Sequence, residues 1–267
     1  MTAQTRSEIA GLLSRHGLSP SRRLGQHFLA DANITRKIVD LSGVEAGDQV
    51  IEVGAGTGTL TRALAATGAR VVAYEVDAGL LPVLEEVTRG LPVEIRSLDV
   101  TDVDLAAELA TGRWVMVANL PYNVGTPLLM DALRRVPQIE RFVVMVQREV
   151  AERLVARPGS RQYGLPSVTV TIYARALLAF RVPAQVFYPA PNVESAVIVL
   201  DRLPAPAESE RAVQIAAAAF NQRRKMLRGS LAAVLDDPNA VLESIGIDPT
   251  SRAEDLAPDD YLALARA

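Results

Sequence analysis

Hydrophobic positions after residue 48 fall into short runs that alternate with amphipathic stretches. The runs are rich in β-branched residues, as buried strands are, and comprise Val50–Val53, Val71–Val76, Val93–Ile95, Trp114–Ala118 and Phe142–Val146. Apolar residues at helical spacing lie between them, at about 60–66, 78–88 and 126–135. Strands that alternate with helices predict a parallel sheet with helices on both faces.

Two further β-rich runs follow, Ser167–Val182 and Ser195–Asp201. A proline-rich segment with Pro183, Pro189 and Pro191 joins them, and it carries no helical pattern. Strands without a crossover helix pair antiparallel, so we expect an antiparallel pair that finishes the sheet.

The segment Leu203–Ala207 contains spaced prolines, which stiffen the chain and cannot continue a strand. Strand patterns end there. Helical patterns take over at 209–220, about 227–235, 240–245 and 259–265. The sequence therefore predicts an α/β domain over residues 1–203 and a small all-α domain over residues 204–267.

Composition narrows the chemistry. The chain has 267 residues, 49% of them hydrophobic, which is enough for a full core, and it has no apolar run long enough to span a bilayer and no signal-peptide pattern. We expect a soluble cytoplasmic protein that does not bind membranes. The absence of cysteine excludes disulfides and thiol nucleophiles, and the two histidines, His16 and His27, are too few for most metal cages. We expect no metal.

A glycine-rich turn follows the first strand, with Gly54, Gly56 and Gly58 ahead of a helical pattern. Glycines allow the backbone to approach a ligand closely. A dinucleotide fingerprint would place its third glycine at position 59, where Thr59 stands. The spacing disfavours a dinucleotide and favours a cofactor without a pyrophosphate, although tight packing of helix on strand would also explain such a turn.

Two acids occupy the ends of the next strands. Glu75 ends the second strand, where a doubly wound sheet presents an acid to a ribose hydroxyl. Asp99 follows the third strand, where an adenine amine could donate to it. The alternatives are an acid that ends a strand in solvent and an aspartate that forms a turn.

The segment Asn119-Leu120-Pro121-Tyr122 follows the fourth strand. The exocyclic nitrogen of adenine is a poor nucleophile because its lone pair is delocalised into the ring. The Asn119 side-chain oxygen and a backbone carbonyl next to Pro121 could accept both amine hydrogens and free that lone pair to attack a methyl group. Tyr122 offers a ring on which the base could stack. A strand-ending turn with a core aromatic is the alternative, and the glycine turn, Glu75 and Asp99 weigh against it.

These motifs, in this order, resemble those of the ribosomal RNA adenine dimethyltransferases of the KsgA type, over nearly the whole chain. Leu24–Leu29 resembles the N-terminal cofactor motif of that family, with His27 where asparagine is common. Phe187–Val193 resembles its aromatic-proline motif near the target base, and Phe220–Arg228 resembles a segment of its helical C-terminal domain.

The resemblance implies a Rossmann-like S-adenosylmethionine-dependent methyltransferase domain with a mostly parallel sheet ending in an antiparallel pair, followed by a small all-α C-terminal domain. It implies dimethylation of the N6 amines of two adjacent adenines near the 3′ end of small-subunit (16S) ribosomal RNA, coupled to small-subunit assembly. We expect a monomer whose partner is this RNA within the immature small subunit. The expected cofactor-binding residues are Gln26, His27, Leu29, Glu52, Gly54, Gly56, Glu75, Val76, Asp99, Val100 and Asn119. The expected catalytic residues are Asn119, Leu120, Pro121, Tyr122 and Phe187.

Contact with RNA must rely on local basic patches because the net charge is −3. The expected RNA-binding residues are Arg22, Arg23, Arg148, Arg153, Arg223, Arg224, Lys225 and Arg228. On one helix Arg224 and Arg228 would share a face. The alternatives are a solvated face, or ion pairs with Asp236 or Asp237.

Two other functions stay open at this point. One is the resistance methyltransferase family that acts on large-subunit ribosomal RNA and shares the cofactor motifs. The other is a ribosome assembly factor whose catalysis is dispensable. A DNA adenine methyltransferase fits less well, because those enzymes usually carry an acidic or asparagine residue followed by two prolines.

Overall fold

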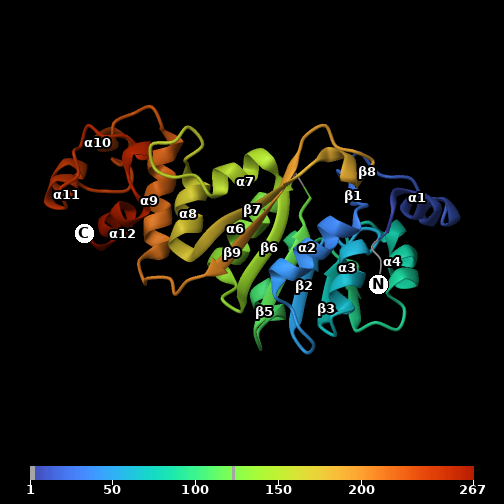
Figure 1. Ribbon diagram of the computed structural model, residues 1–267. Coiled ribbons are helices and arrows are strands. Elements are labelled where there is room, and N and C mark those ends of the chain that lie inside the picture. The colour runs from blue at the N-terminus through green and yellow to red at the C-terminus, as the bar shows by residue number, and fades with distance from the viewer. Residues whose placement is uncertain (1–3, 122–123) are drawn as a thin grey trace. The chain divides into compact units, whose positions relative to one another are not determined.

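The computed structural model describes residues 4–121 and 124–267. The chain divides into two compact units, one made of Met1–Ala151 with Leu177–Asp201 and the other of Glu152–Ala176 with Arg202–Ala267. Figure 1 shows the sheet of the first unit in blue to orange and the helices of the C-terminal region in orange to red.

A seven-stranded sheet forms the centre of the first unit, in the order β4-β3-β2-β5-β6-β9-β7. Its strands are β2 (Gln49–Val53), β3 (Arg70–Tyr74), β4 (Val93–Arg96), β5 (Trp114–Asn119), β6 (Ile139–Gln147), β7 (Ala174–Val182) and β9 (Ser195–Arg202). Neighbours from β4 to β6 pair parallel, and β6 pairs antiparallel with β9, with Val144 opposite Ile198. The expectation of a mostly parallel sheet with an antiparallel end is confirmed.

Helices connect and cover these strands. In the first unit they are α1 (Arg6–Arg15), α2 (Ala32–Ser42), α3 (Thr59–Ala65), η1 (Ala78–Leu80), α4 (Leu81–Thr88), η2 (Val100–Asp102), α5 (Leu105–Glu108), α6 (Gly125–Arg135) and η3 (Ala184–Val186), while α7 (Arg148–Leu154) begins in this unit. The hydrophobic pattern predicted none of the helices before residue 49. Asp31 begins α2, because its carboxylate accepts hydrogen bonds from the backbone N–H groups of Asn33 and Ile34.

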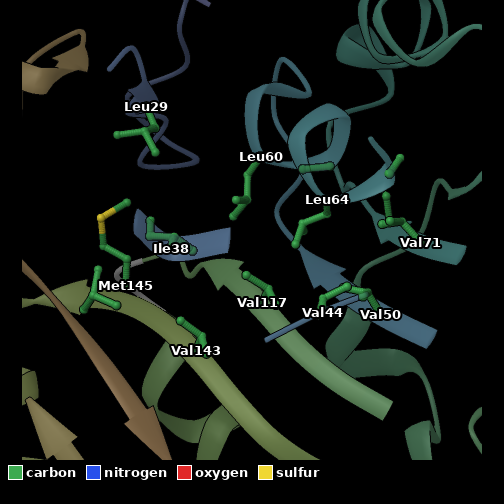
Figure 2. Close-up of a cluster of buried hydrophobic side chains, with 14 of the residues drawn as sticks. Leu29, Ile38, Val44, Val50, Leu60, Leu64, Val71, Val117, Val143 and Met145 are labelled. Carbon is green, nitrogen blue, oxygen red and sulfur yellow. The ribbon is translucent and has the colours of Figure 1, made fainter. Parts of the chain in front are cut away.

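A large hydrophobic cluster lies between the sheet and the helices that cover it (Figure 2). Ile38 of α2 and Leu64 of α3 are almost completely buried, as are Val117 of β5 and Val143 of β6. Strands of a parallel sheet are covered on both faces, which explains why they form nearly continuous apolar runs in the sequence.

A two-stranded sheet stands apart from the central one. It joins β1 (Phe28–Leu29) to β8 (Phe187–Tyr188) in antiparallel register, with Leu29 opposite Phe187. This pair brings the N-terminal motif at residues 24–29 next to the aromatic-proline motif, although about 160 residues separate them in the chain. The peptide bond between Tyr188 and Pro189 is cis.

The second unit is helical, with α8 (Leu165–Tyr173), α9 (Ser209–Asn221), α10 (Leu227–Ser230), α11 (Pro238–Ser244), η4 (Ala253–Asp255) and α12 (Pro258–Arg266). Its core includes a ring cluster in which Phe220 contacts Tyr163 edge-on and also Tyr261. The Tyr163 hydroxyl donates to the carbonyl of Leu256 at 3.0 Å. These contacts hold residues 152–176 in the helical unit, whereas the predicted boundary at residue 203 placed them in the first domain.

The prediction of a strand from Ser167 onward is wrong for its first part, because α8 extends to Tyr173. The backbone N–H of Gly164 donates to the Ser167 hydroxyl, and Pro166 occupies the first turn, so the helix has a defined start. Valine, isoleucine and threonine are typical of strands because their branched side chains pack well on a sheet. In this segment the packing around α8 overrides that preference. Strand β7 begins only at Ala174.

Candidate active site

A pocket lies at the carboxyl edge of the sheet. It is lined by residues of Leu24–Leu29, by Glu52, by residues of Gly54–Leu60 except Gly58, by Glu75 and Val76, and by Asn119–Pro121. Strands β2, β3 and β5 are neighbours and run parallel, so the residues that follow them meet at one edge. The topology thus brings together most of the residues that the sequence singled out.

The glycine turn forms one wall of the pocket. Gly54 and Gly56 have φ angles of +75° and +58°, which side chains other than hydrogen rarely allow. A Cβ atom on Gly54 would lie 3.4 Å from the Pro121 ring, and one on Gly56 would lie 3.0 Å from the Phe28 ring. The turn is therefore packed between the Asn119–Pro121 segment and the N-terminal motif.

Glu75 is held in place by the backbone around it. The N–H of Gly56 donates to Oε2 at 2.7 Å, and the N–H of Asp77 donates to Oε1 at 2.9 Å. The side chain is 6% exposed, and burial raises the pKa of its carboxyl although these two hydrogen bonds lower it. Val76 beside it is 50% exposed, so an apolar surface faces the pocket next to a fixed acid.

Glu52 reaches the pocket from the end of β2 and is almost completely buried. Burial raises the pKa of Glu52 to about 8, and the nearby Glu75 carboxylate adds to the rise. Its Oε2 atom has no hydrogen-bond partner among the described residues. A buried polar atom without a partner is costly, so this oxygen fits the polar part of a ligand.

Asn119 stands opposite the glycine turn. Its amide nitrogen donates to the carbonyl of His27 at 3.1 Å, which directs the amide oxygen the other way. The carbonyl of Pro121 accepts from the N–H of Gly125 at 2.8 Å. Of the two backbone carbonyls beside the proline, those of Leu120 and Pro121, the Pro121 carbonyl is therefore already an acceptor at the start of α6. Tyr122 lies outside the described residues.

The N-terminal motif joins the two sides of the site. The Gln26 amide donates to Asp77 and accepts from the N–H of Ser21, both at 2.7 Å. The His27 ring nitrogen Nδ1 lies 2.7 Å from the carbonyl oxygen of Pro189 and donates to it. His27 therefore connects the pocket to the aromatic-proline motif, and a second hollow lies there, lined by Pro20, Arg22, Gln26, His27, Pro189, Ala190 and Asn192.

Among the residues that the structure describes, three of the expected cofactor-binding and catalytic residues do not line the pocket. Asp99 is exposed, and its carboxylate accepts from the N–H and the hydroxyl of Thr101, which lowers its pKa. Val100 is buried behind it. Phe187 is fully buried in the same hydrophobic cluster as Leu64 and Val117, on the strand that pairs with Leu29. Cofactor contact for Asp99 and Val100, and contact with the base for Phe187, stay predictions.

The pocket is also lined by residues that the sequence analysis did not select as site residues, among them Phe28, Thr57, Thr59 and Leu60. All of them lie inside or directly beside the motifs. The signal that could have found them is the turn itself, since a loop that wraps a ligand contributes its non-glycine residues as well.

The basic segment at residues 223–228 does not form one helix, so the expected shared face of Arg224 and Arg228 is wrong. Helix α9 ends at Asn221, and α10 begins only at Leu227. Arg223 pairs with Glu254 at 2.7 Å rather than with Asp236 or Asp237. Arg224, Lys225 and Arg228 are exposed, and neither Arg224 nor Lys225 forms an ion pair with a described residue.

The other expected RNA-binding residues lie on loops and on α7. Arg22 and Arg23 are exposed, and Arg22 lines the second hollow. Arg148 and Arg153 are exposed at the two ends of α7, and Arg148 pairs with Glu194 at 2.6 Å. RNA contact for all of these residues stays a prediction.

The described part of the chain contains no helix long and apolar enough to cross a membrane. Within residues 4–121 and 124–267, no cluster of three or more histidine or acidic side chains is placed to hold a metal ion.

A doubly wound sheet with a glycine turn, an acid after the next strand and an Asn-Leu-Pro turn at the same edge defines a methyltransferase-type fold. Solved structures share this fold, among them the following two. A dimethyladenosine transferase from Plasmodium falciparum aligns with a TM-score of 0.76 and 23% identity, over 89% of this chain and 96% of that one. The 23S rRNA methyltransferase ErmE aligns with a TM-score of 0.67 and 25% identity, over 90% and 98%.

Residues 18–267 match the family described as Ribosomal RNA adenine dimethylase, and the chain belongs to this family. Curated relatives named Ribosomal RNA small subunit methyltransferase A are similar over nearly their whole length. The protein of that name from Cereibacter sphaeroides is 45% identical over 96% of this chain and 94% of its own. The one from Leifsonia xyli subsp. xyli is 44% identical over 97% and 96%.

Proposed function

We propose that this chain transfers methyl groups from S-adenosylmethionine to the N6 amines of two adjacent adenines near the 3′ end of small-subunit (16S) ribosomal RNA. Family membership supports the reaction class. The full-length similarity to small-subunit methyltransferases supports the choice of RNA, because these relatives are 44–45% identical to the chain whereas ErmE is 25% identical.

The described pocket fits S-adenosylmethionine. We assign the ribose hydroxyls to Glu75, whose two oxygens are fixed by backbone N–H groups, and the adenine ring to the exposed side chain of Val76. The unpartnered Oε2 of Glu52 suits the polar methionine end of the cofactor. When bound, S-adenosylmethionine supplies a methyl group on a positively charged sulfur.

In this proposal the reaction depends on two hydrogen-bond acceptors from consecutive residues of the chain. The side-chain oxygen of Asn119 and the carbonyl of Leu120 would each accept one hydrogen of the adenine amine, since the Pro121 carbonyl already accepts from Gly125. With both hydrogens held, the nitrogen becomes pyramidal and its lone pair points at the methyl group. The new C–N bond would form from that lone pair while the bond between the methyl carbon and sulfur breaks and its electron pair stays on sulfur, and the nitrogen would then lose one proton to solvent.

One observation carries the proposal above the others. The glycine turn lies next to the segment that carries the proposed acceptors, because a Cβ on Gly54 would lie 3.4 Å from the Pro121 ring and 3.6 Å from the backbone carbonyl oxygen of Asn119. A methyl donor on one motif and an adenine amine on the other would therefore meet within a single pocket. Tyr122 and Phe187 remain our candidates for holding the base.

The proposed partner is the RNA of the immature small ribosomal subunit, met by a monomer in the cytoplasm. Arg22, which lines the hollow beside His27, would contact RNA close to the target base. The helical C-terminal region, residues 204–267, would add contacts through Arg224, Lys225 and Arg228, which are exposed. These contacts would supply affinity rather than sequence choice, because folded RNA is recognised largely through its backbone and shape.

Primer extension on ribosomal RNA from cells with and without the gene tests the proposal, since dimethylated adenines block copying. We expect two adjacent stops near the 3′ end of small-subunit RNA that vanish on deletion and return with the wild-type gene. Stops in large-subunit RNA instead would favour the resistance type. Unchanged stops together with an assembly defect would favour an assembly factor.

A further inference from the structure

A glutamine near the N-terminus is bound to the glycine turn. Gln4 is 2% exposed, and its side-chain nitrogen donates to the carbonyl of Thr57 at 2.9 Å. Its side-chain oxygen accepts from the hydroxyls of Thr57 and Thr59, at 2.8 and 2.7 Å. Both ends of the amide therefore have partners, and all of these partners belong to the turn.

The two threonines connect Gln4 to the cofactor pocket. Thr57 and Thr59 line the pocket and flank Gly58, a left-handed residue with φ of +79°. Gly56, the residue before Thr57, donates its N–H to Glu75. A continuous set of hydrogen bonds and covalent links thus runs from Gln4 through the turn to the acid that we assign to the ribose.

The segment that carries Gln4, residues 4–17, is held independently of this glutamine; we refer to it as the N-terminal arm. Arg6 donates to the carbonyls of Gln185 and Phe187. Arg15 contacts the carboxylate of Glu86 at 2.7 Å, and Ile9 and Leu13 pack in one buried cluster with Phe28 and Leu80. Removing the Gln4 side chain would therefore leave the arm docked.

We propose that Gln4 is a positioning residue that holds the glycine turn in its ligand-binding shape, which makes the N-terminal arm part of the cofactor site. The arm lies before residues 18–267, the range that matches the family. A turn with several left-handed glycines has many other conformations open to it, and a fixed turn spares the ligand the entropic cost of ordering it. This inference rests on the proposed function, because it concerns binding of S-adenosylmethionine.

The Gln4→Ala variant tests the inference through binding and turnover measured separately. We expect the Kd for S-adenosylmethionine, measured by calorimetry, and the KM for it to rise about tenfold, since the lost bonds each carry a modest free energy and only part of it couples to the ligand. The kcat at saturating cofactor should stay within about twofold, because Gln4 does not touch the reacting groups.

Leu12→Ala is the matched control. Leu12 is 7% exposed on the same arm, and its aliphatic side chain cannot form a hydrogen bond with the turn. It should lower the melting temperature and leave the Kd unchanged at temperatures where the protein stays folded. A purely structural role for Gln4 would give the same pattern in Gln4→Ala, and that result would overturn the inference.

Exchanges at Thr59 sharpen the test. Thr59→Ser keeps the hydroxyl and should bind S-adenosylmethionine nearly as the wild type does, whereas Thr59→Val removes it and should raise the Kd. In the double variant Gln4→Ala with Thr59→Val, the loss of binding free energy should be smaller than the sum of the losses in the two single variants. Full additivity would contradict the inference. Equal Kd values for the wild type and Gln4→Ala would overturn this inference alone. A wild-type chain that does not bind S-adenosylmethionine would instead overturn the proposed function.

Discussion

The pocket at the sheet edge and the basic segment at residues 223–228 are built by opposite means. In the pocket, Glu52 and Glu75 are buried, and backbone N–H groups fix the carboxylate of Glu75. In the basic segment, Arg224 and Lys225 are exposed on a turn between two helices. Arg223 forms an ion pair with Glu254.

This difference predicts different physics for the two proposed ligands. A pocket formed by buried and pre-oriented groups recognises its ligand by geometry, and salt screens buried groups little. Exposed cations attract a polyanion by charge, which added salt weakens strongly. Substitutions in the two regions should therefore change different measured quantities, and the following experiments test that separation.

Asn119→Ala should have the largest effect. Loss of the side-chain acceptor removes a hydrogen bond that strengthens as the amine becomes pyramidal, so turnover should fall by roughly 10² to 10³. Binding of S-adenosylmethionine should change little. Single-turnover methylation of small-subunit particles and calorimetry with the cofactor measure the two quantities.

Asn119→Asp is the control for this experiment, because it keeps an acceptor oxygen but loses the donor that reaches the His27 carbonyl. It should retain more activity than Asn119→Ala. The second methyl transfer should depend differently on Asn119, since the monomethylated amine has only one hydrogen to donate. Near-normal single-turnover rates in Asn119→Ala would remove this residue from the mechanism.

Glu75→Ala should weaken cofactor binding. A hydrogen bond to a charged group contributes about 1.5 to 3 kcal/mol, so the Kd for S-adenosylmethionine should rise roughly tenfold or more. Calorimetric titration of the folded variant measures this. Glu85→Ala makes the same exchange at an exposed position of α4 and should leave the Kd unchanged. Equal affinities in both variants would exclude Glu75 from the ribose site.

Glu52 should make the stability of the ligand-free protein depend on pH. Its pKa is about 8 in the folded chain, above the ordinary value near 4.5, so the folded state binds more protons than the unfolded state between these values. The free energy of unfolding should therefore fall as pH rises from about 5 to 8, by at most about 1.4 kcal/mol per pH unit from this group.

Glu52→Gln removes the titration while it keeps the size of the side chain. Its melting temperature should change less between pH 5 and pH 8 than that of the wild type, as followed by circular dichroism across that range. Parallel curves for the two proteins would show that Glu52 does not titrate in this window.

The sequence pattern selected many of the residues that line the pocket because these residues follow parallel strands. Once β2, β3 and β5 are recognised as neighbours, Gly54, Glu75 and Asn119 must meet at one edge. The local pattern predicts the parallel sheet, and the order of its strands comes from the structure.

Contacts between distant segments could not be predicted in this way. The bond from His27 to the Pro189 carbonyl depends on the β1–β8 pair, and the bonds from Gln4 depend on how the N-terminal arm docks. Neither has a periodic signal. In the segment 167–173 the residue types even favoured a strand, and packing around α8 decided the outcome.

Arg224→Ala with Arg228→Ala should have the smallest effect of these substitutions, and its signature is a change in the salt dependence of RNA binding. If both side chains contact phosphates, binding to the immature small subunit should weaken, and the slope of log K against log salt should fall by up to about one unit per lost contact. The Kd for S-adenosylmethionine should not change. Arg70→Ala with Arg135→Ala removes the same charge from two exposed, ion-paired arginines elsewhere and should leave the slope unaltered.

Arg223→Ala completes the comparison within the same segment. Arg223 pairs with Glu254 and donates to the carbonyl of Arg161, so its loss should lower the melting temperature of the helical unit more than it changes the salt slope. The double variant at Arg224 and Arg228 should show the reverse. A lowered melting temperature with an unchanged slope in that double variant would mean that these arginines stabilise the fold, and the RNA contacts would then have to come from other cations, with Arg22 beside the second hollow as the first to test.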